Sequence, residues 1–121
     1  MLWINRAVGD EKAMIVVLFE VWVDPAKGDR YFELAAALRK ELDGAPGFLS
    51  VERFRSLTDE GKYLSFSVWK DRASIEAWHA NRNHANAQVE GRGGVFLDYR
   101  IRVADVFRDY DMKAGRPKVS K

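Results

Sequence analysis

Four stretches of the chain have the residue pattern of β-strands. Residues 14–23 (MIVVLFEVWV) are β-branched or aromatic with one charge, Glu20, which predicts a central strand buried on most of both faces. Residues 48–57 and 62–70 alternate in polarity on either side of a turn at 58–61 and predict a hairpin. Residues 95–107 alternate over about twice the usual strand length. We therefore expect this last strand to run past its own sheet and pair with another subunit.

Two stretches have the spacing of amphipathic helices. Apolar residues recur three or four positions apart between Tyr31 and Leu42, after Asp24-Pro25 and before a Gly-Ala-Pro-Gly stop at 44–47, which predicts a helix from about residue 25 or 28 to 42. Asp71 is a good N-cap for a second helix over residues 72–90. The run Asn-Arg-Asn at 81–83 forms helix poorly, so we expect a break there, with His84 opening a second short helix.

The predicted order is strand, helix, strand, strand, helix, strand. Two right-handed crossovers around a hairpin give an α+β, ferredoxin-like βαββαβ fold, in which a four-stranded antiparallel sheet carries both helices on one face. We expect Trp22, Phe54, Tyr63 and Trp69 on the other face. A monomer should not expose so much apolar surface, so the pattern predicts a homodimer that closes sheet against sheet.

Composition narrows the class of protein. The 121 residues fit one domain, which we place at residues 14–110 between a flexible leader (1–13) and a basic, disordered tail (111–121). The tail carries a charge of +3, whereas the whole chain carries +2, so the other 110 residues sum to about −1. A domain with this charge is not expected to bind nucleic acid. No apolar run approaches the roughly 20 residues of a membrane span. No signal peptide is evident, and we expect a cytoplasmic protein without thiol chemistry, since it has no Cys.

Candidate chemistry gathers on the second helix. Trp78 and Ile75 share an apolar face, beside a face with Asn81, His84 and Gln88. His84 can act as a general base or a haem ligand, while Asn81 and Gln88 can donate hydrogen bonds to a developing oxyanion. His84 equally fits a surface position, and Trp78 equally fits the core. Two His residues without a third ligand at metal spacing predict no metal site.

We expect this helix to form one wall of a pocket whose other wall is the sheet. Glu20 is the lone charge of the central strand and is a second candidate base if the sheet face lines the cavity. We expect the substrate pocket to be lined by aromatic residues of the sheet and by one amide of the helix: Trp22, Phe54, Tyr63, Trp69 and Gln88. His79 follows Trp78 directly, so we expect it to point away from this pocket.

These residues resemble the antibiotic biosynthesis monooxygenase family of dimeric α+β barrels over about residues 14–110. The resemblance is carried by Pro-Gly-Phe at 46–48, VWKD at 68–71, the helix with Trp78, and HANAQVEGR at 84–92. The family includes cofactor-free oxygenases that convert polyketide-derived phenols to quinones, and relatives that degrade haem with a Trp, a His and an Asn. Trp78 matches that Trp, but His84 lies only six residues later, and Phe19-Glu20 stands where the Asn is wanted.

The resemblance therefore implies three hypotheses. The first is a cofactor-independent monooxygenase acting on an aromatic or polyketide-like phenol or quinol, with Trp78 stacking the ring and His84, Asn81 or Glu20 taking the phenolic proton. The second is a haem-binding or haem-degrading protein with His84 as ligand. The third is a non-catalytic dimeric binding or stress-response module.

Overall fold

A computed structural model describes residues 13–80 and 94–113 of the chain. The order of elements is the one that the sequence predicts: β1 (Ile15–Val23), a short 3-10 helix η1 (Pro25–Lys27), α2 (Gly28–Asp43), β2 (Phe48–Arg55), β3 (Lys62–Trp69), a helix over residues 72–80, and β4 (Phe96–Asp105).

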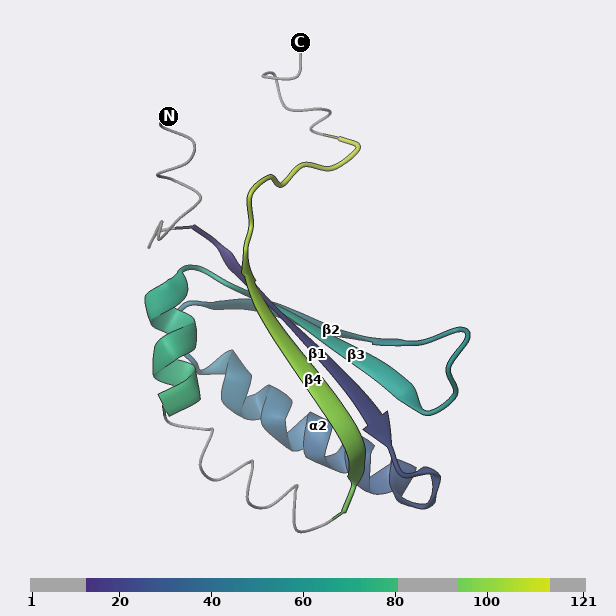
Figure 1. Cartoon of the computed structure of the whole chain (residues 1–121). Coiled ribbons are helices and arrows are strands. Elements are labelled where there is room, and N and C mark those ends of the chain that lie inside the picture. The colour runs from purple at the N-terminus through teal and green to yellow at the C-terminus, as the bar shows by residue number, and fades with distance from the viewer. Residues whose placement is uncertain (1–12, 81–93, 114–121) are drawn as a thin grey trace.

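The described strands form one antiparallel sheet in the order β2-β3-β1-β4, with β1 paired on both sides. Figure 1 shows both helices on the same face of this sheet and the other face without a helix. We call these the helix-covered face and the helix-free face. The prediction of an α+β, ferredoxin-like arrangement is confirmed.

Local sequence explains where η1 begins and where α2, which follows it directly, ends. The Asp24 carboxylate accepts a hydrogen bond from the Ala26 N–H at 3.0 Å, and Pro25 follows in the first turn of η1. At the other end, the N–H of Gly44 reaches the carbonyl of Glu41 at 3.2 Å. Between these ends, α2 buries Tyr31, Ala35 and Leu42 against the sheet.

The core lies on the helix-covered face in two clusters. One cluster contains Ile15, Leu42, Trp69 and Ile75. The other contains Val21, Val23, Tyr31 and Val95. The core therefore draws on β1, β3 and both helices, which ties the helix layer to the two central strands.

The prediction that Tyr63 and Trp69 lie on the helix-free face is wrong. Trp69 is 1% exposed in the first cluster, and Tyr63 stacks on Tyr31 of α2 with ring centroids 5.1 Å apart. Strand alternation groups Tyr63 and Trp69 with Ser65 and Ser67 but does not say which face the helices cover. The small serines, which suggest an outward face, instead leave room beneath the helices.

The last strand separates from the sheet sooner than predicted. Ladder pairing of β4 with β1 ends at Asp105, and one further hydrogen bond joins the Val106 N–H to the Met14 carbonyl at 2.8 Å. Beyond it, residues 107–113 leave the sheet as an exposed segment (Figure 1). The leader to residue 12 and the tail from residue 114 lie outside the described residues, so their roles stay predictions. No helix of the described part is long and apolar enough to span a membrane.

Candidate functional site

The helix over residues 72–80 begins at a capped turn. The Asp71 carboxylate accepts hydrogen bonds from the Ser74 hydroxyl at 2.6 Å and from the Ser74 N–H at 2.9 Å. These bonds, the hydroxyl first, hold the pKa of Asp71 below its usual value. Gly47 packs on the same turn with φ +81°, and a Cβ there would lie 1.8 Å from Ser74 Oγ. The cap and the close approach of Gly47 together set the position of this helix on the sheet.

Trp78 faces the sheet from this helix. Its ring centroid lies 5.8 Å from that of Trp69, at a tilt of 39°. The buried indole N–H of Trp69 donates a hydrogen bond to Ser67 Oγ at 3.0 Å. Trp78 is half-buried at the margin of the first core cluster. From this position an indole can both fill the core and contact a ring bound beside it.

A groove of about 410 Å³ lies between this helix and the C-terminal half of β4. Both elements contribute apolar and charged side chains to its lining: Arg72, Ile75, Glu76, His79, Val103 and Asp105. The guanidinium of Arg72 and the carboxylate of Asp105 bridge the two walls at 3.6 Å. The volume falls in the range of small-molecule sites, and half of the lining residues are apolar while the other half are charged or polar.

Three apolar side chains of β4 form an exposed row, and one of them, Val103, lines this groove. Tyr99, Ile101 and Val103 are 54%, 43% and 50% exposed. Their Cα partners on β1 all contribute to the core of the helix-covered face, so the three side chains belong to that face. Tyr99 also contacts Phe19, with ring centroids 5.8 Å apart. A row of exposed apolar residues beside a groove indicates a surface that binds a ligand or a partner.

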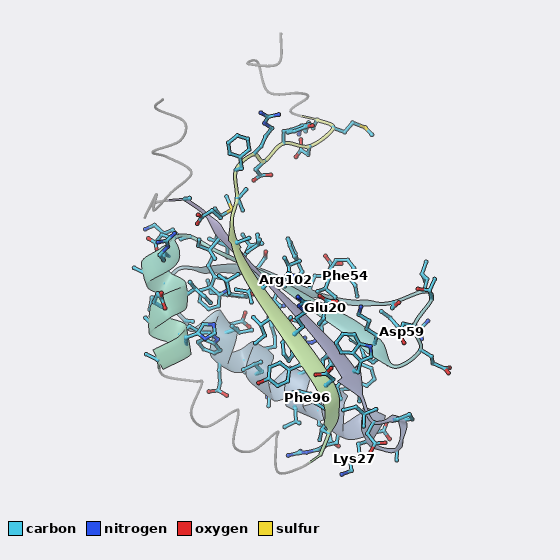
Figure 2. All side chains as sticks on the ribbon, viewed as in Figure 1. Glu20, Lys27, Phe54, Asp59, Phe96 and Arg102 are labelled. Carbon is cyan, nitrogen blue, oxygen red and sulfur yellow. The ribbon has the colours of Figure 1, made fainter. Side chains whose placement is uncertain are left out.

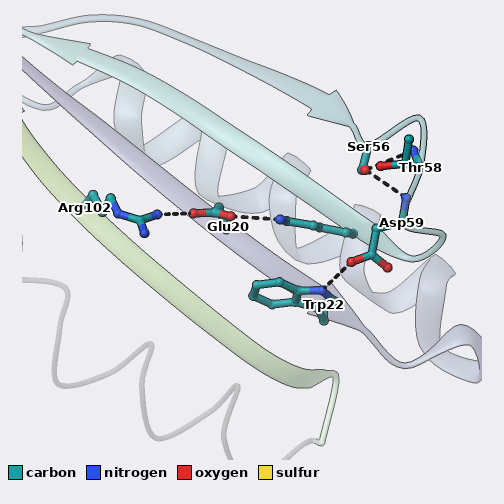
Figure 3. A network of polar contacts seen from close by, with 7 residues as sticks. Glu20, Trp22, Ser56, Thr58, Asp59 and Arg102 are labelled. Atoms are coloured by element: carbon teal, nitrogen blue, oxygen red, sulfur yellow. Dashed lines mark hydrogen bonds and ion pairs between the residues drawn. The ribbon is translucent and has the colours of Figure 1, made fainter.

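Glu20 lies on the helix-free face, between two cations (Figure 3). Its carboxylate pairs with Lys62 Nζ at 2.9 Å and with Arg102 Nη1 at 2.5 Å. Figure 2 shows Glu20 and Arg102 side by side on β1 and β4. The hydrogen bond from Lys62 is the largest cause that holds the pKa of Glu20 below its usual value, with the charges of Lys62 and Arg102 acting in the same direction. A carboxylate paired in this way is a weak proton acceptor.

Glu20 and Trp78 therefore do not face one cavity in the described chain. The prediction of a pocket walled by this helix and by the face with Glu20 is wrong. The physical reason is that successive side chains of a strand point to opposite faces of the sheet, so Glu20 lies on the other face from its neighbours Phe19 and Val21.

Trp22 and Phe54 lie on the helix-free face, as the sequence predicts. The Trp22 indole N–H donates to the Asp59 carboxylate at 3.0 Å, and Lys62 Nζ lies 4.7 Å from the Trp22 ring centroid (Figure 3). Phe54 is 45% exposed. The two aromatics thus lie across the sheet from the groove, and a role in a substrate pocket stays a prediction for them.

Three candidate residues, Asn81, His84 and Gln88, lie outside the described residues, as does the expected helix break at 81–83. Their roles stay predictions, including that of His84 as a haem ligand. Among residues 13–80 and 94–113, no group of three His, Asp or Glu side chains is placed to hold a metal ion.

His79 is the groove residue that sequence reasoning passed over. We expected it to point away from the pocket because it follows Trp78. It does diverge from Trp78, but into the groove. The signal was present in the spacing, because Arg72, Ile75, Glu76 and His79 recur at the three- and four-residue intervals of one helix face.

The chain is similar in sequence to a known family and to two known proteins. The family model described as antibiotic biosynthesis monooxygenase matches residues 14–90. Jasmonate monooxygenase ABM of Pyricularia oryzae is 40% identical over 93 residues, which is 77% of this chain and 43% of that protein. The chain thus spans less than half the length of this relative. The uncharacterised protein YqjZ of Bacillus subtilis is 32% identical over 78 residues, which is 64% of this chain and 67% of that protein.

Solved structures share the fold at low sequence identity. A mutant of SnoaB, a cofactor-independent oxygenase from Streptomyces nogalater, superposes with a TM-score of 0.68 at 13% identity, covering 80% of this chain and 96% of that one. Rv0793 from Mycobacterium tuberculosis superposes with a TM-score of 0.69 at 13% identity, covering 82% of this chain and all of that one. From the match over residues 14–90, the chain belongs to the antibiotic biosynthesis monooxygenase family.

Proposed function

We propose that this protein is a cofactor-independent monooxygenase that acts on an aromatic, polyketide-like phenol or quinol bound on the helix-covered face. The observation that carries the proposal is the groove in which His79 lies beside the apolar lining residues Ile75 and Val103. Membership of a monooxygenase family and the fold shared with a cofactor-independent oxygenase support it.

The residues of this face have distinct roles in the proposal. The exposed side chains of Tyr99, Ile101 and Val103 contact a planar ring and exclude water from it. Trp78 closes the end of the site nearest the core. His79 takes the phenolic proton, because a neutral imidazole is a suitable base near pH 7. His84 and Asn81 remain candidates for the same proton and for a hydrogen bond to the oxyanion.

The proposed reaction balances without a cofactor. Loss of the phenolic proton to His79 gives a resonance-stabilised anion whose ring carbon is electron-rich. This anion reduces O₂ and bonds to it, and the returned proton makes a hydroperoxide. Loss of water breaks the O–O bond and leaves a carbonyl on the ring, so the ring C–H of the phenol (the CH₂ of its keto form) becomes C=O, while O₂ supplies the carbonyl oxygen and the oxygen of the water. The substrate provides all four electrons.

Oxygen uptake tests the proposal. Chelator-treated protein is incubated with anthrone, the keto form of a tricyclic phenol, and we expect one O₂ consumed for each quinone formed. His79→Gln should lower kcat by about 10²-fold or more, with a small change in KM. His84→Gln tests the other imidazole, and Lys40→Gln on exposed α2 is the control.

Two results would contradict parts of this proposal. Absence of uptake with anthrone and with quinols contradicts the oxygenase function. Uptake only after addition of haem, flavin or metal contradicts cofactor independence. A large loss in His84→Gln with none in His79→Gln moves the role of base to His84 and leaves the reaction unchanged.

We also infer that the protein acts as a homodimer closed through the helix-free face. Apolar side chains of the two central strands are partly exposed there: Val16, Leu18, Leu64, Phe66 and Val68. A monomer leaves this row in contact with water, whereas a second copy covers it with an equal surface.

A further inference from the structure

Two buried polar atoms of the helix-covered face have no hydrogen-bond partner within the described part of the chain. They are the phenol oxygen of Tyr31 on α2 and the Nε of Arg53 on β2. Tyr31 is 4% exposed, whereas Arg53 is half-buried on an edge strand of the sheet. A buried polar group without a partner destabilises the fold, so two such groups on facing elements indicate a site for an acceptor.

The two side chains lie beside each other and both carry donors. Burial raises the pKa of Tyr31, and the charge of the nearby Arg53 only partly opposes this rise, so the phenol keeps its proton at neutral pH. The guanidinium lies beside the phenol but outside hydrogen-bond geometry, and it carries no acceptor of its own. The O–H of Tyr31 and the Nε–H of Arg53 therefore both need an acceptor from elsewhere.

The charge at this place is positive. Arg53 and Arg55 are the Cα partners of Ser65 and Tyr63, and Tyr63 stacks on Tyr31, so both cations lie on the helix-covered side of β2. Neither arginine forms an ion pair with a carboxylate of residues 13–80 or 94–113. Ser65 is small, which leaves the guanidinium of Arg53 room to turn away from the phenol and admit a ligand oxygen. The acceptor that suits this place is an anion.

The donors fit a carboxylate on an aromatic ring. The Nε and one Nη of a guanidinium form a parallel pair of donors that binds both oxygens of a carboxylate, and the phenol O–H can donate to one of the same oxygens. Phe32 is 51% exposed, and its ring centroid lies 5.3 Å from that of Tyr31 and 5.5 Å from that of Tyr63. A ring attached to the carboxylate can pack on this exposed side chain.

We propose that Arg53 and Tyr31 form a binding site for an aromatic carboxylate, with the carboxylate between the guanidinium and the phenol and the ring against Phe32. Arg55 is exposed two residues along β2, and its charge attracts the anion to the site. The bound carboxylate accepts from both buried donors and balances the charge of Arg53.

This site lies apart from the groove. Tyr31 belongs to the core cluster of Val21, near the end of β1, whereas the groove is lined by Ile15 at the start of β1 and by Asp105 at the end of β4. β2, which carries Arg53, and β4 are opposite edges of the sheet. The proposal therefore does not rest on the oxygenase function, and the two can fail separately.

Titration with sodium benzoate tests the site directly. Isotope-labelled full-length protein is followed by NMR at constant ionic strength, so that screening does not change during the titration. We expect the Nε–H signal of Arg53 to shift downfield and to saturate with one benzoate per chain. Acetate should shift the same signal but bind about tenfold more weakly, because it has no ring to pack on Phe32.

Four variants separate the groups of the site. Arg53→Gln should raise the Kd for benzoate about tenfold or more, and Arg53→Lys should have an intermediate effect, since it keeps the charge but loses the paired donors. Tyr31→Phe should raise the Kd about threefold through the loss of one hydrogen bond. Phe32→Ala should weaken benzoate but not acetate. The matched control is Arg30→Gln, which removes an exposed cation of α2.

Three outcomes would overturn the proposal. Without a saturable shift of the Arg53 signal, a bridging water only serves the two donors. An equal rise of the Kd in Arg30→Gln and Arg53→Gln would show unspecific attraction of an anion. A rise in Arg72→Gln with none in Arg53→Gln would move benzoate into the groove. Tyr31→Phe keeps the buried ring and Arg53→Lys keeps the charge, so the test holds if Arg53→Gln fails to fold.

Discussion

The two faces of the sheet are built from the same strands but are completed in different ways. On the helix-covered face, Ile15, Val21 and Trp69 are 2%, 0% and 1% exposed, because the helices pack on them. On the helix-free face, their neighbours Leu18 and Phe66 remain partly exposed. One chain supplies the whole of the core on the helix-covered face, whereas in the proposed dimer a second copy excludes water from the helix-free face. If the proposed dimer forms, folding and assembly use opposite sides of β1 and β3.

Polar groups differ between the faces as well. The buried Ser67 hydroxyl accepts a single neutral hydrogen bond from Trp69. Glu20 on the other face sits between Lys62 and Arg102, an ionic group within an apolar surface. Closing that surface against a second copy removes water from all three charges, which costs free energy unless the pairing is kept. The stability of an interface on the helix-free face therefore depends on keeping these charges paired, whereas the Ser67–Trp69 hydrogen bond in the core carries no charge.

The largest effect on stability should come from the helix-covered face. Trp69→Ala removes a buried indole between Phe48 and Trp78 and should lower the free energy of unfolding by about 3–5 kcal/mol. Urea unfolding at one fixed protein concentration measures this change. Trp22→Ala on the helix-free face is the comparison, and equal losses for the two would contradict the division between core and interface.

The next effect should be on assembly. Phe66→Glu places a carboxylate among the apolar side chains of the helix-free face and should raise the dimer dissociation constant about 100-fold, since the buried charge finds no partner. Sedimentation equilibrium measures it. Leu57→Glu is the control, because Leu57 is 96% exposed in the β2–β3 turn. A dimer unchanged by Phe66→Glu would place the interface elsewhere.

A moderate loss of stability is expected where the second helix approaches the sheet. Gly47→Ala puts a Cβ into the Ser74 side chain and forces a non-glycine residue to φ +81°. The free energy of unfolding should fall by about 1–3 kcal/mol. Gly28→Ala, where a Cβ meets nothing within 4 Å, is the matched control. A tolerated Gly47→Ala would show that this helix can shift on the sheet.

The smallest effect should be the pH dependence of Glu20. Its pKa is lower in the folded chain than its usual value of 4.5, so the ion pairs stabilise the fold fully above pH 4.5. As the pH falls through the folded pKa, protonation of the carboxyl removes this contribution. Stability of Glu20→Gln, measured by urea unfolding from pH 6 to pH 3, should therefore fall less steeply than that of the original chain. Parallel curves would assign the acid sensitivity to other carboxyls.

The sequence by itself determined the order of elements, the alternation along each strand and the start of both helices. These depend on local properties: β-branched runs, apolar spacing, the Asp71 cap and the turn residues before Phe48. Trp22 and Phe54 do lie on the predicted face, but the alternation of β1 and β2 only groups the residues of each strand and does not by itself say which group the helices leave open.

Only the tertiary structure decided which face the helices cover, and with it the location of the site. Alternation is symmetric between the faces, so Trp69 fits either until a helix packs against it, and Glu20 is separated from Trp78 by the thickness of the sheet. His79 lies in a groove only because the helix over residues 72–80 packs beside β4, and the sequence does not show that these two segments are neighbours. Which faces meet depends on contacts between elements, whereas period and propensity describe each element alone.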